Sequence, residues 1–328
     1  MIDAPSKFQF DQTSHDTLES LYAHLKRFRV SRERYFHEYY PRHDKATGEL
    51  IPFKDYEQYQ SQNFVSKVTL KKWIKDNPEE GWKWAKEWLA QRKAEKNLIY
   101  APSQVELRTL SCPSMPYYDK IGAAEGGYYG VTTDLGYAPR FNGAPLVFTP
   151  LPVGATILCD TREQAPLKLN WPTRAAALNV GDYALDTPHD RGVRIERKSL
   201  SDFCGTLSGR KVVRESKRNG TVEDSAFQRF DRELERAQKL DYYVVMMVES
   251  NINDAQRFDF LPQTQWLKAS PSYIFRQLRE LLIKYPLHFQ CVFVDGRAEM
   301  ASKVLRVFEL GTSVRYIDLQ YAYEEGRL

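Results

Sequence analysis

The fold is decided by residues 160–202, which read DTREQAPLKLNWPTRAAALNVGDYALDTPHDRGVRIERKSLSD. Two short apolar runs in this stretch, 181–185 and 193–198, predict strands, and a third strand over 156–159 ends directly before Asp160. The segment that follows them, Ser199–Asp202, resembles a capping box and predicts a short helix that stops at Gly209. Strands followed by a helix in this way indicate a layered α/β domain.

Downstream of this stretch the alternation of strands and helices continues. Apolar residues at helical spacing predict a helix up to about Leu240, and the run 242–249 predicts a buried strand. Pro271 opens another helix, residues 289–294 predict a strand, and a last helix ends at Gly311. We therefore expect one α/β domain over residues 155–328.

Upstream, residues 1–112 predict a mainly helical module that is rich in aromatic and basic side chains. One helix is expected from Asn77-Pro78 to about Asn97, with tryptophans interleaved with lysines. Such tryptophans could stack on unpaired bases or pack in a core; we favour the core for Trp88 and leave Trp84 open. The Gly- and Pro-rich residues 113–154 predict loops and turns that connect the two units. We expect the module to bind DNA or a protein partner.

Composition narrows the class of protein. The 328 residues carry 47 Lys and Arg against 43 Asp and Glu, a net charge of +4, and 42% of them are apolar. These values exclude a wholly disordered chain, but so small a charge does not by itself identify a nucleic-acid partner. No run of about 18 uncharged apolar residues is present, and the N-terminus lacks the apolar core of a signal peptide. We therefore expect no membrane partner.

Cysteine usage indicates a reducing compartment. The 4 cysteines are scattered and form no CxxC pair, which argues against both a disulfide framework and a zinc site. We expect a cytoplasmic location in a bacterial, archaeal or phage-infected cell, and a nuclear one in a eukaryote.

The strand over 193–198 carries the residues that indicate chemistry. Side chains alternate along a strand, so Glu196 and Lys198 project from one face and Arg197 from the other. Beside a second strand that bears Asp182, this carboxylate and ammonium could hold Mg²⁺ and orient or help deprotonate a metal-bound water. That inventory fits metal-dependent phosphodiester hydrolysis.

Two further acidic residues could complete such a site. Asp160 ends its strand and could reach the same metal, and Glu163 lies just beyond it. The alternative is that these residues are solvated surface charges or salt bridges, which is the commoner fate of Asp, Glu and Lys. On the Asp182, Glu196 and Lys198 triplet alone, that alternative is favoured.

The full string of motifs resembles the nuclease domain of the XPF-type structure-specific endonucleases. The strand is followed by Asp160-Thr161-Arg162-Glu163, then by Val180-Gly181-Asp182-Tyr183, then by Glu196-Arg197-Lys198-Ser199-Leu200-Ser201-Asp202, and Gly209-Arg210 comes next. The motifs stand in the family's order. The resemblance covers residues 155–250 by motif and 250–310 by the strand and helix pattern.

The resemblance implies a restriction-endonuclease-like fold, which is a central mixed sheet flanked by helices, here preceded by the helical N-terminal module. It also implies Mg²⁺, with Mn²⁺ as a substitute, and cutting of DNA near junctions, flaps or other branches, as in DNA repair or recombination. Members of the family commonly pair through the nuclease domain, so a homodimer or heterodimer is expected.

Carried over position by position, the resemblance also assigns the site. Asp160, Asp182 and Glu196 are the expected metal-site carboxylates, Glu163 contributes to the site, and Lys198 is the catalytic lysine. The expected supporting or DNA-contacting residues in these motifs are Arg162, Arg197 and Asp202.

Two features depart from the family's pattern. The helix-hairpin-helix modules that follow the nuclease in many members have no signature in the residues up to Leu328, so branch recognition cannot be assumed. The other departure is the basic segment 210–220, which is predicted as an extended loop. Its Arg210, Lys211 and Arg214 could grip the phosphate backbone beside the site, or the segment could be a solvated loop.

The sequence therefore predicts a metal-dependent endonuclease that acts on branched, flap or single-strand-containing DNA. The alternative from another class is a non-catalytic DNA-binding or scaffolding protein that retains the nuclease fold. An RNA nuclease differs from the first prediction only in substrate.

Overall fold

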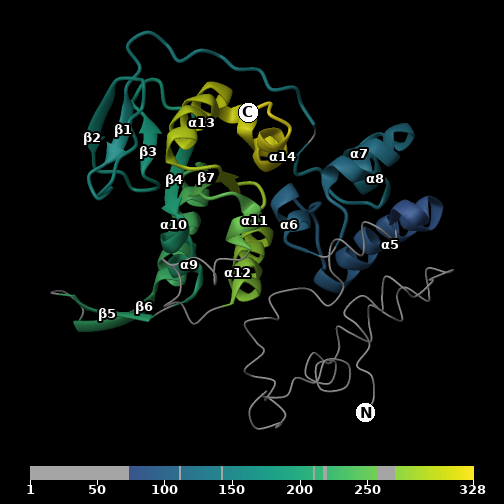
Figure 1. The fold of residues 1–328 in the computed structure, drawn as a ribbon. Helices are drawn as coiled ribbons and strands as arrows, with labels where there is room; N and C mark the ends of the chain where they lie inside the picture. Colours follow the sequence, from purple (N-terminus) through teal and green to yellow (C-terminus); the bar gives the residue numbers. More distant parts are fainter. Residues whose placement is uncertain (1–73, 111, 142, 210, 217–219, 257–269) are drawn as a thin grey trace, which may run out of the picture. The chain divides into compact units, whose positions relative to one another are not determined.

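The chain divides into two compact units. The computed structural model describes residues 74–110, 112–141, 143–209, 211–216, 220–256 and 270–328 (Figure 1). Of these, residues 74–99 and Leu107–Tyr137 form the first unit, and Tyr100–Glu106 and Ala138–Leu328 form the second. Helix α6 (Gln104–Arg108) lies at the point where the chain passes from one to the other. No helix in the described residues has the length and apolar character needed to cross a bilayer.

The described part of the first unit is helical, as the sequence predicts, whereas residues 1–73 of the predicted helical module lie outside the described residues. It contains α5 (Pro78–Lys96), α7 (Met115–Ile121), the 3-10 helix Ala123–Glu125 and α8 (Gly127–Asp134). Aromatic side chains fill its core: Trp84 and Tyr118 are fully buried, and the Tyr118 hydroxyl donates to the Ala85 carbonyl over 3.0 Å. Trp88 is buried too, which confirms its assignment to the core and leaves neither Trp84 nor Trp88 exposed for stacking on bases.

Helices α7 and α8 correct the sequence prediction for part of residues 113–154, where only loops and turns are expected. The glycines there end and join helices instead of interrupting them. Gly122 follows the last residue of α7, and Gly126 and Gly127 turn the chain into α8 with φ of +81° and +65°, values that favour glycine. The prediction of loops alone was therefore wrong for residues 115–134, because these glycines lie at the ends of helices. The domain boundaries at 112 and 154 stay a prediction.

The second unit is built on a six-stranded mixed sheet, which confirms the predicted α/β class. Its strand order is β2-β1-β3-β4-β7-β8. The bounds are Thr173–Ala176 (β2), Ile157–Asp160 (β1), Tyr183–Leu185 (β3), Val193–Ser199 (β4), Tyr243–Glu249 (β7) and Phe289–Val294 (β8). Strand β4 runs antiparallel to β3 and parallel to β7, so it lies at the junction between the antiparallel and parallel parts of the sheet. Only β2 was not expected.

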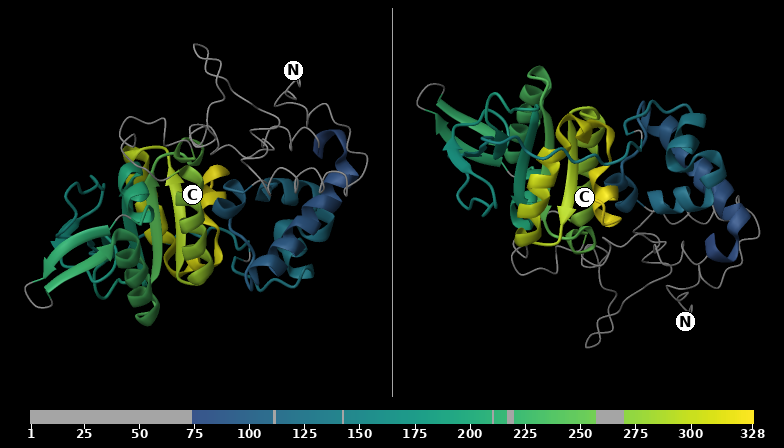
Figure 2. Two further views of the ribbon diagram at one scale, coloured as in Figure 1. Left: turned by 90° about the horizontal axis from the view of Figure 1, so that it is seen from below. Right: turned by 90° about the horizontal axis from the view of Figure 1, so that it is seen from above.

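Helices cover both faces of this sheet (Figure 1; Figure 2). The bounds of those on one face are Leu200–Leu207 (α9), Ala226–Lys239 (α10), Ile252–Ala255 (α11) and Pro271–Lys284 (α12). The other face carries α13 (Arg297–Leu310), the 3-10 helix Gly311–Tyr316 and α14 (Leu319–Glu324). Strand β7 is buried on both faces: Val244 and Met246 belong to the first core, and Val245 and Met247 to the second. A continuous apolar run is what a strand between two helical layers requires.

The basic segment 210–220 differs from its prediction as an extended loop. Strands β5 (Lys211–Ser216) and β6 (Gly220–Ser225) pair antiparallel as a separate two-stranded sheet between α9 and α10. Arg210 lies outside the described residues. Lys211 and Arg214 lie on β5, where the structure describes the backbone but not the side chains.

Polar side chains cover the free edge of β8, which would otherwise present unpaired backbone groups. Gln320 of α14 accepts the Phe293 amide over 2.8 Å. Arg140 donates to the Phe289 carbonyl over 2.9 Å and to the Pro286 carbonyl over 3.0 Å. Its third partner is Glu106, at 3.0 Å, and both of these charged side chains are almost completely buried.

Replacing Arg140 by methionine should remove this arrangement while keeping an unbranched side chain. Glu106 would then be a buried carboxylate without its cation, a change that costs about 3–5 kcal/mol. Urea unfolding followed by circular dichroism measures the loss. The matched control is Arg306→Met, because Arg306 forms a more exposed ion pair with Glu309; we expect it to cost less than about 1 kcal/mol. Equal losses for the two variants would contradict the role given to Arg140.

Candidate active site

The candidate site is centred on β4, whose two faces have the arrangement that alternation predicts. Glu196 and Lys198 lie on the face covered by α10 and form an ion pair with each other. The Glu196 residue is 5% exposed. Burial opposes the charge on Lys198, but the carboxylates of Glu196 and Asp182 outweigh burial and raise the pKa of the ammonium. Lys198 is therefore held as a cation beside the acidic group of the site.

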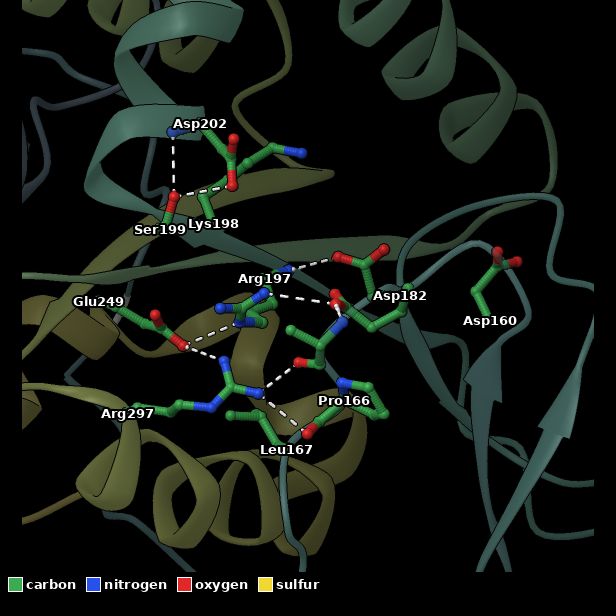
Figure 3. Close-up of polar contacts among 12 residues, drawn as sticks. Asp160, Pro166, Leu167, Asp182, Arg197, Lys198, Ser199, Asp202, Glu249 and Arg297 are labelled. Atoms are coloured by element: carbon green, nitrogen blue, oxygen red, sulfur yellow. Dashed lines mark hydrogen bonds and ion pairs between the residues drawn. The ribbon is translucent and has the colours of Figure 1, made fainter. Parts of the chain in front are cut away.

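Asp182 is fixed between β1 and β4 by its backbone. Its carbonyl accepts the Asp160 amide over 2.8 Å, and its own amide donates to the Ile195 carbonyl over 2.7 Å. One carboxylate oxygen then accepts the Arg197 amide over 2.8 Å, which brings the side chain against β4 (Figure 3). Burial, followed by repulsion from Glu196, raises the pKa of Asp182 well above its ordinary value. The structure thus brings Asp182, Glu196 and Lys198 together.

Glu233 of α10 joins this group, and the sequence analysis missed it. Its carboxylate accepts the Gly181 amide over 2.7 Å. Burial and the charge of Glu196 raise its pKa as well. The signal for it was available, because Glu233 comes three residues after Phe230 and directly before Leu234 on an amphipathic helix, where an apolar residue is expected.

Arg197 lies on the opposite face of β4 and ties together segments that are distant in sequence. It donates to Glu249 over 2.8 Å and to Glu163 over 3.3 Å. Arg297, at the start of α13, donates to the same Glu249 oxygen over 2.9 Å and to the Pro166 carbonyl over 2.9 Å (Figure 3). Arg197 therefore holds Glu163 and links it to Glu249 at the end of β7.

Asp160 is not gathered with Asp182 and Glu196. Figure 3 shows its carboxylate apart from Asp182, and both of its oxygens are engaged elsewhere. They accept two bonds from the Arg162 guanidinium and the backbone amides of Arg162 and Leu178. Burial opposes ionisation of Asp160, but these donors outweigh it and lower its pKa. Arg162 itself keeps 73% of its side chain exposed.

Asp202 lies one turn beyond Lys198, at the start of α9. Its amide donates to the Ser199 hydroxyl over 3.1 Å, and that hydroxyl donates to the Asp202 carboxylate over 2.7 Å (Figure 3). This arrangement confirms the predicted helix start at Ser199–Asp202. Because α9 begins immediately after Lys198, the cap fixes the end of the strand that carries the lysine.

A mixed sheet with converging carboxylates and a lysine on one strand defines a restriction-endonuclease-like nuclease domain. The family model of the ERCC4 domain matches residues 135–306, and the chain belongs to this family. The match confirms the resemblance to the XPF-type nucleases that the motifs indicate. A search of curated proteins finds no match for the chain.

Replacing Asp182 by asparagine should stabilise the metal-free protein. The pKa of Asp182 is higher in the folded than in the unfolded chain, so the folded state binds more protons between its ordinary pKa and the raised one. The stability of the wild type therefore falls as the pH rises through that window. In EDTA at about pH 8, we expect Asp182→Asn to raise Tm by roughly 3 °C or more, or about 1 kcal/mol, and the gain to vanish near pH 4.

The control for this measurement is Asp295→Asn, because Asp295 is exposed. Its Tm should follow that of the wild type at both pH values. A Tm of Asp182→Asn at or below the wild-type value at the higher pH would contradict the unfavourable burial of the Asp182 charge.

Proposed function

We propose that the protein is a metal-dependent endonuclease that hydrolyses phosphodiester bonds in branched, flap or single-strand-containing DNA. The observation that carries the proposal is that half-buried Asp182 and buried Glu196 lie together beside Lys198. Asp182 as an anion beside Glu196 is costly, because burial and repulsion from Glu196 both oppose its ionisation. A cation bound between them offsets that cost.

Mg²⁺ fits the donors of this site, and Mn²⁺ is the expected substitute. Within the described parts of the chain, no three His, Cys, Asp or Glu side chains are placed to hold a metal ion together. In proteins Mg²⁺ is usually bound by one or two carboxylates, with waters and substrate phosphates completing its shell. Asp182 and Glu196 are the two carboxylates in this proposal. When bound, the ion would activate a water and offset charge on the phosphate.

Lys198 has the role of a fixed cation at the reacting phosphate. The carboxylates of Glu196 and Asp182 raise the pKa of Lys198, so in the metal-free protein the side chain is an ammonium that donates a hydrogen bond to Glu196. An ammonium so placed stabilises the negative charge that develops on phosphate oxygens during hydrolysis.

Other residues of the motifs have supporting roles in the proposal. Asp160 holds Arg162, whose exposed guanidinium is able to contact a DNA phosphate. Glu163 contributes to the site through Arg197, which holds the end of β4, and Asp202 caps the next helix. The assignment of Asp160 as a metal ligand is the least supported, because its oxygens already accept four hydrogen bonds.

The remaining partners are proposed from the sequence. Lys211 and Arg214 on β5 would follow the DNA backbone away from the site, as a β-ribbon does in a groove. In the first unit, Trp82 is only half-buried and lies under Lys86, at 5.1 Å from the ring centre, which suits contact with a base or a partner. Pairing of two copies, or of this chain with a relative, through the nuclease domain completes the proposal.

A cleavage assay with Mg²⁺, Mn²⁺ or EDTA on flap, fork, single-stranded and duplex DNA tests the function. We expect metal-dependent cutting that Glu196→Ala abolishes. Lys198→Met should lower kcat by about 10²–10³-fold, the usual effect of removing one group that stabilises the charge developing in the transition state. The control is Glu235→Ala, since Glu235 lies on the exposed part of α10 and should leave the rate unchanged.

Equal cleavage rates for the wild type and Glu196→Ala would contradict the assignment of the site. DNA binding without cutting under any metal would instead favour the scaffolding function. An RNA strand of the same structure in the same assay distinguishes the two nuclease substrates.

A further inference from the structure

The inference concerns Glu233 of α10, which contacts the backbone next to Asp182. Helix α10 packs Phe230, Leu234 and Ala237 into the core under the sheet, and the half-buried Glu233 directly precedes Leu234. Partial burial there raises the pKa of the Glu233 carboxylate, so its presence needs a partner that compensates. That partner is the backbone of the segment that carries Asp182.

Glu233 accepts the Gly181 amide over 2.7 Å. Gly181 has a φ of +72°, and a Cβ at this position would come within 2.9 Å of the Ile195 carbonyl. The next amide, that of Asp182, donates to the same Ile195 carbonyl over 2.7 Å. Two consecutive amides are thus fixed, one by the side chain from α10 and one by β4.

These two bonds determine where the Asp182 carboxylate lies. Glycine is the residue whose backbone is freest to rotate, and Gly181 directly precedes Asp182. With its amide held by Glu233, the turn keeps one conformation, and the Asp182 side chain faces Glu196 and the Arg197 amide. We propose that Glu233 is a positioning residue, which acts on the candidate reaction by anchoring the Gly181–Asp182 backbone through its hydrogen bond to the Gly181 amide.

This inference rests on the proposed function for its catalytic consequence, whereas the anchoring itself does not. The charge of Glu233 and its hydrogen bond can be separated, because glutamine also has a carbonyl oxygen that accepts an amide proton. Glu233→Gln keeps the anchor and removes the charge, and Glu233→Ala removes both. Each variant removes a partly buried carboxylate, which is costly to keep in the folded protein. We therefore expect both variants to fold in metal-free buffer.

The first measurement is hydrogen exchange of the amides over 180–183 by mass spectrometry or NMR, in EDTA. We expect faster exchange in Glu233→Ala and wild-type rates in Glu233→Gln. The controls are Glu235→Ala and Glu235→Gln on the same helix, where the side chain is 46% exposed, and neither should change the exchange. Wild-type exchange in Glu233→Ala would overturn the anchor.

The second measurement is Mg²⁺ affinity by isothermal titration calorimetry without DNA, together with kcat and KM on a flap substrate. Loss of a residue that orients a metal ligand typically weakens metal binding by about 10–100-fold, so we expect that loss, and a lower kcat with KM for DNA unchanged, in Glu233→Ala. Glu233→Gln should stay close to the wild type.

If Glu233→Gln is as impaired as Glu233→Ala, the charge of Glu233 is what matters and its positioning role is overturned. A wild type that binds no metal and cuts nothing would overturn the proposed function instead, which the exchange measurement does not depend on.

Discussion

The burial of acidic side chains against the single ammonium of Lys198 is the constraint on which the rest of the site depends. Asp182 is unfavourable as an anion in this environment, because burial and the neighbouring charge of Glu196 raise its pKa, and Lys198 offsets only part of that cost. A domain that keeps such a group sacrifices stability for a local arrangement, which is the usual relation between stability and an active site. In our account a divalent cation supplies the charge that is missing.

Residues on both faces of β4 hold the acidic side chains and Lys198 in place. On the α10 side, Glu196 and Lys198 present their charges toward the proposed reaction. On the α13 side, Arg197 binds Glu249, which also binds Arg297 and so ties the strand to the loop that follows β1. The amide of Arg197 reaches across to the Asp182 carboxylate, so the backbone of one strand connects both faces to the same site. The position of the Asp182 carboxylate is therefore tied to the backbone of β4.

Much of the second unit could be predicted from the sequence, because its strands are apolar and its helices begin at clear caps. Strand β8 was placed at its observed bounds, and Ser199 is the N-cap of α9, as the capping pattern predicts. Strand β2 was missed because its TRAA residues are mostly exposed and carry no alternation, so only pairing with β1 makes it a strand. At the site, alternation was enough to place Glu196 and Lys198. The contact of Glu233 with Gly181 joins residues far apart in the chain, and no local pattern reports such a contact.

The most direct test of the account is the position of a bound metal ion. Crystals grown with Mn²⁺ give an anomalous difference map that locates the ion without reference to activity. The account predicts a peak in contact with both Asp182 and Glu196, and Asp160 still bound to Arg162. A peak bound by Asp160 in place of Glu196, or no peak at a Mn²⁺ concentration that supports cleavage, would contradict it.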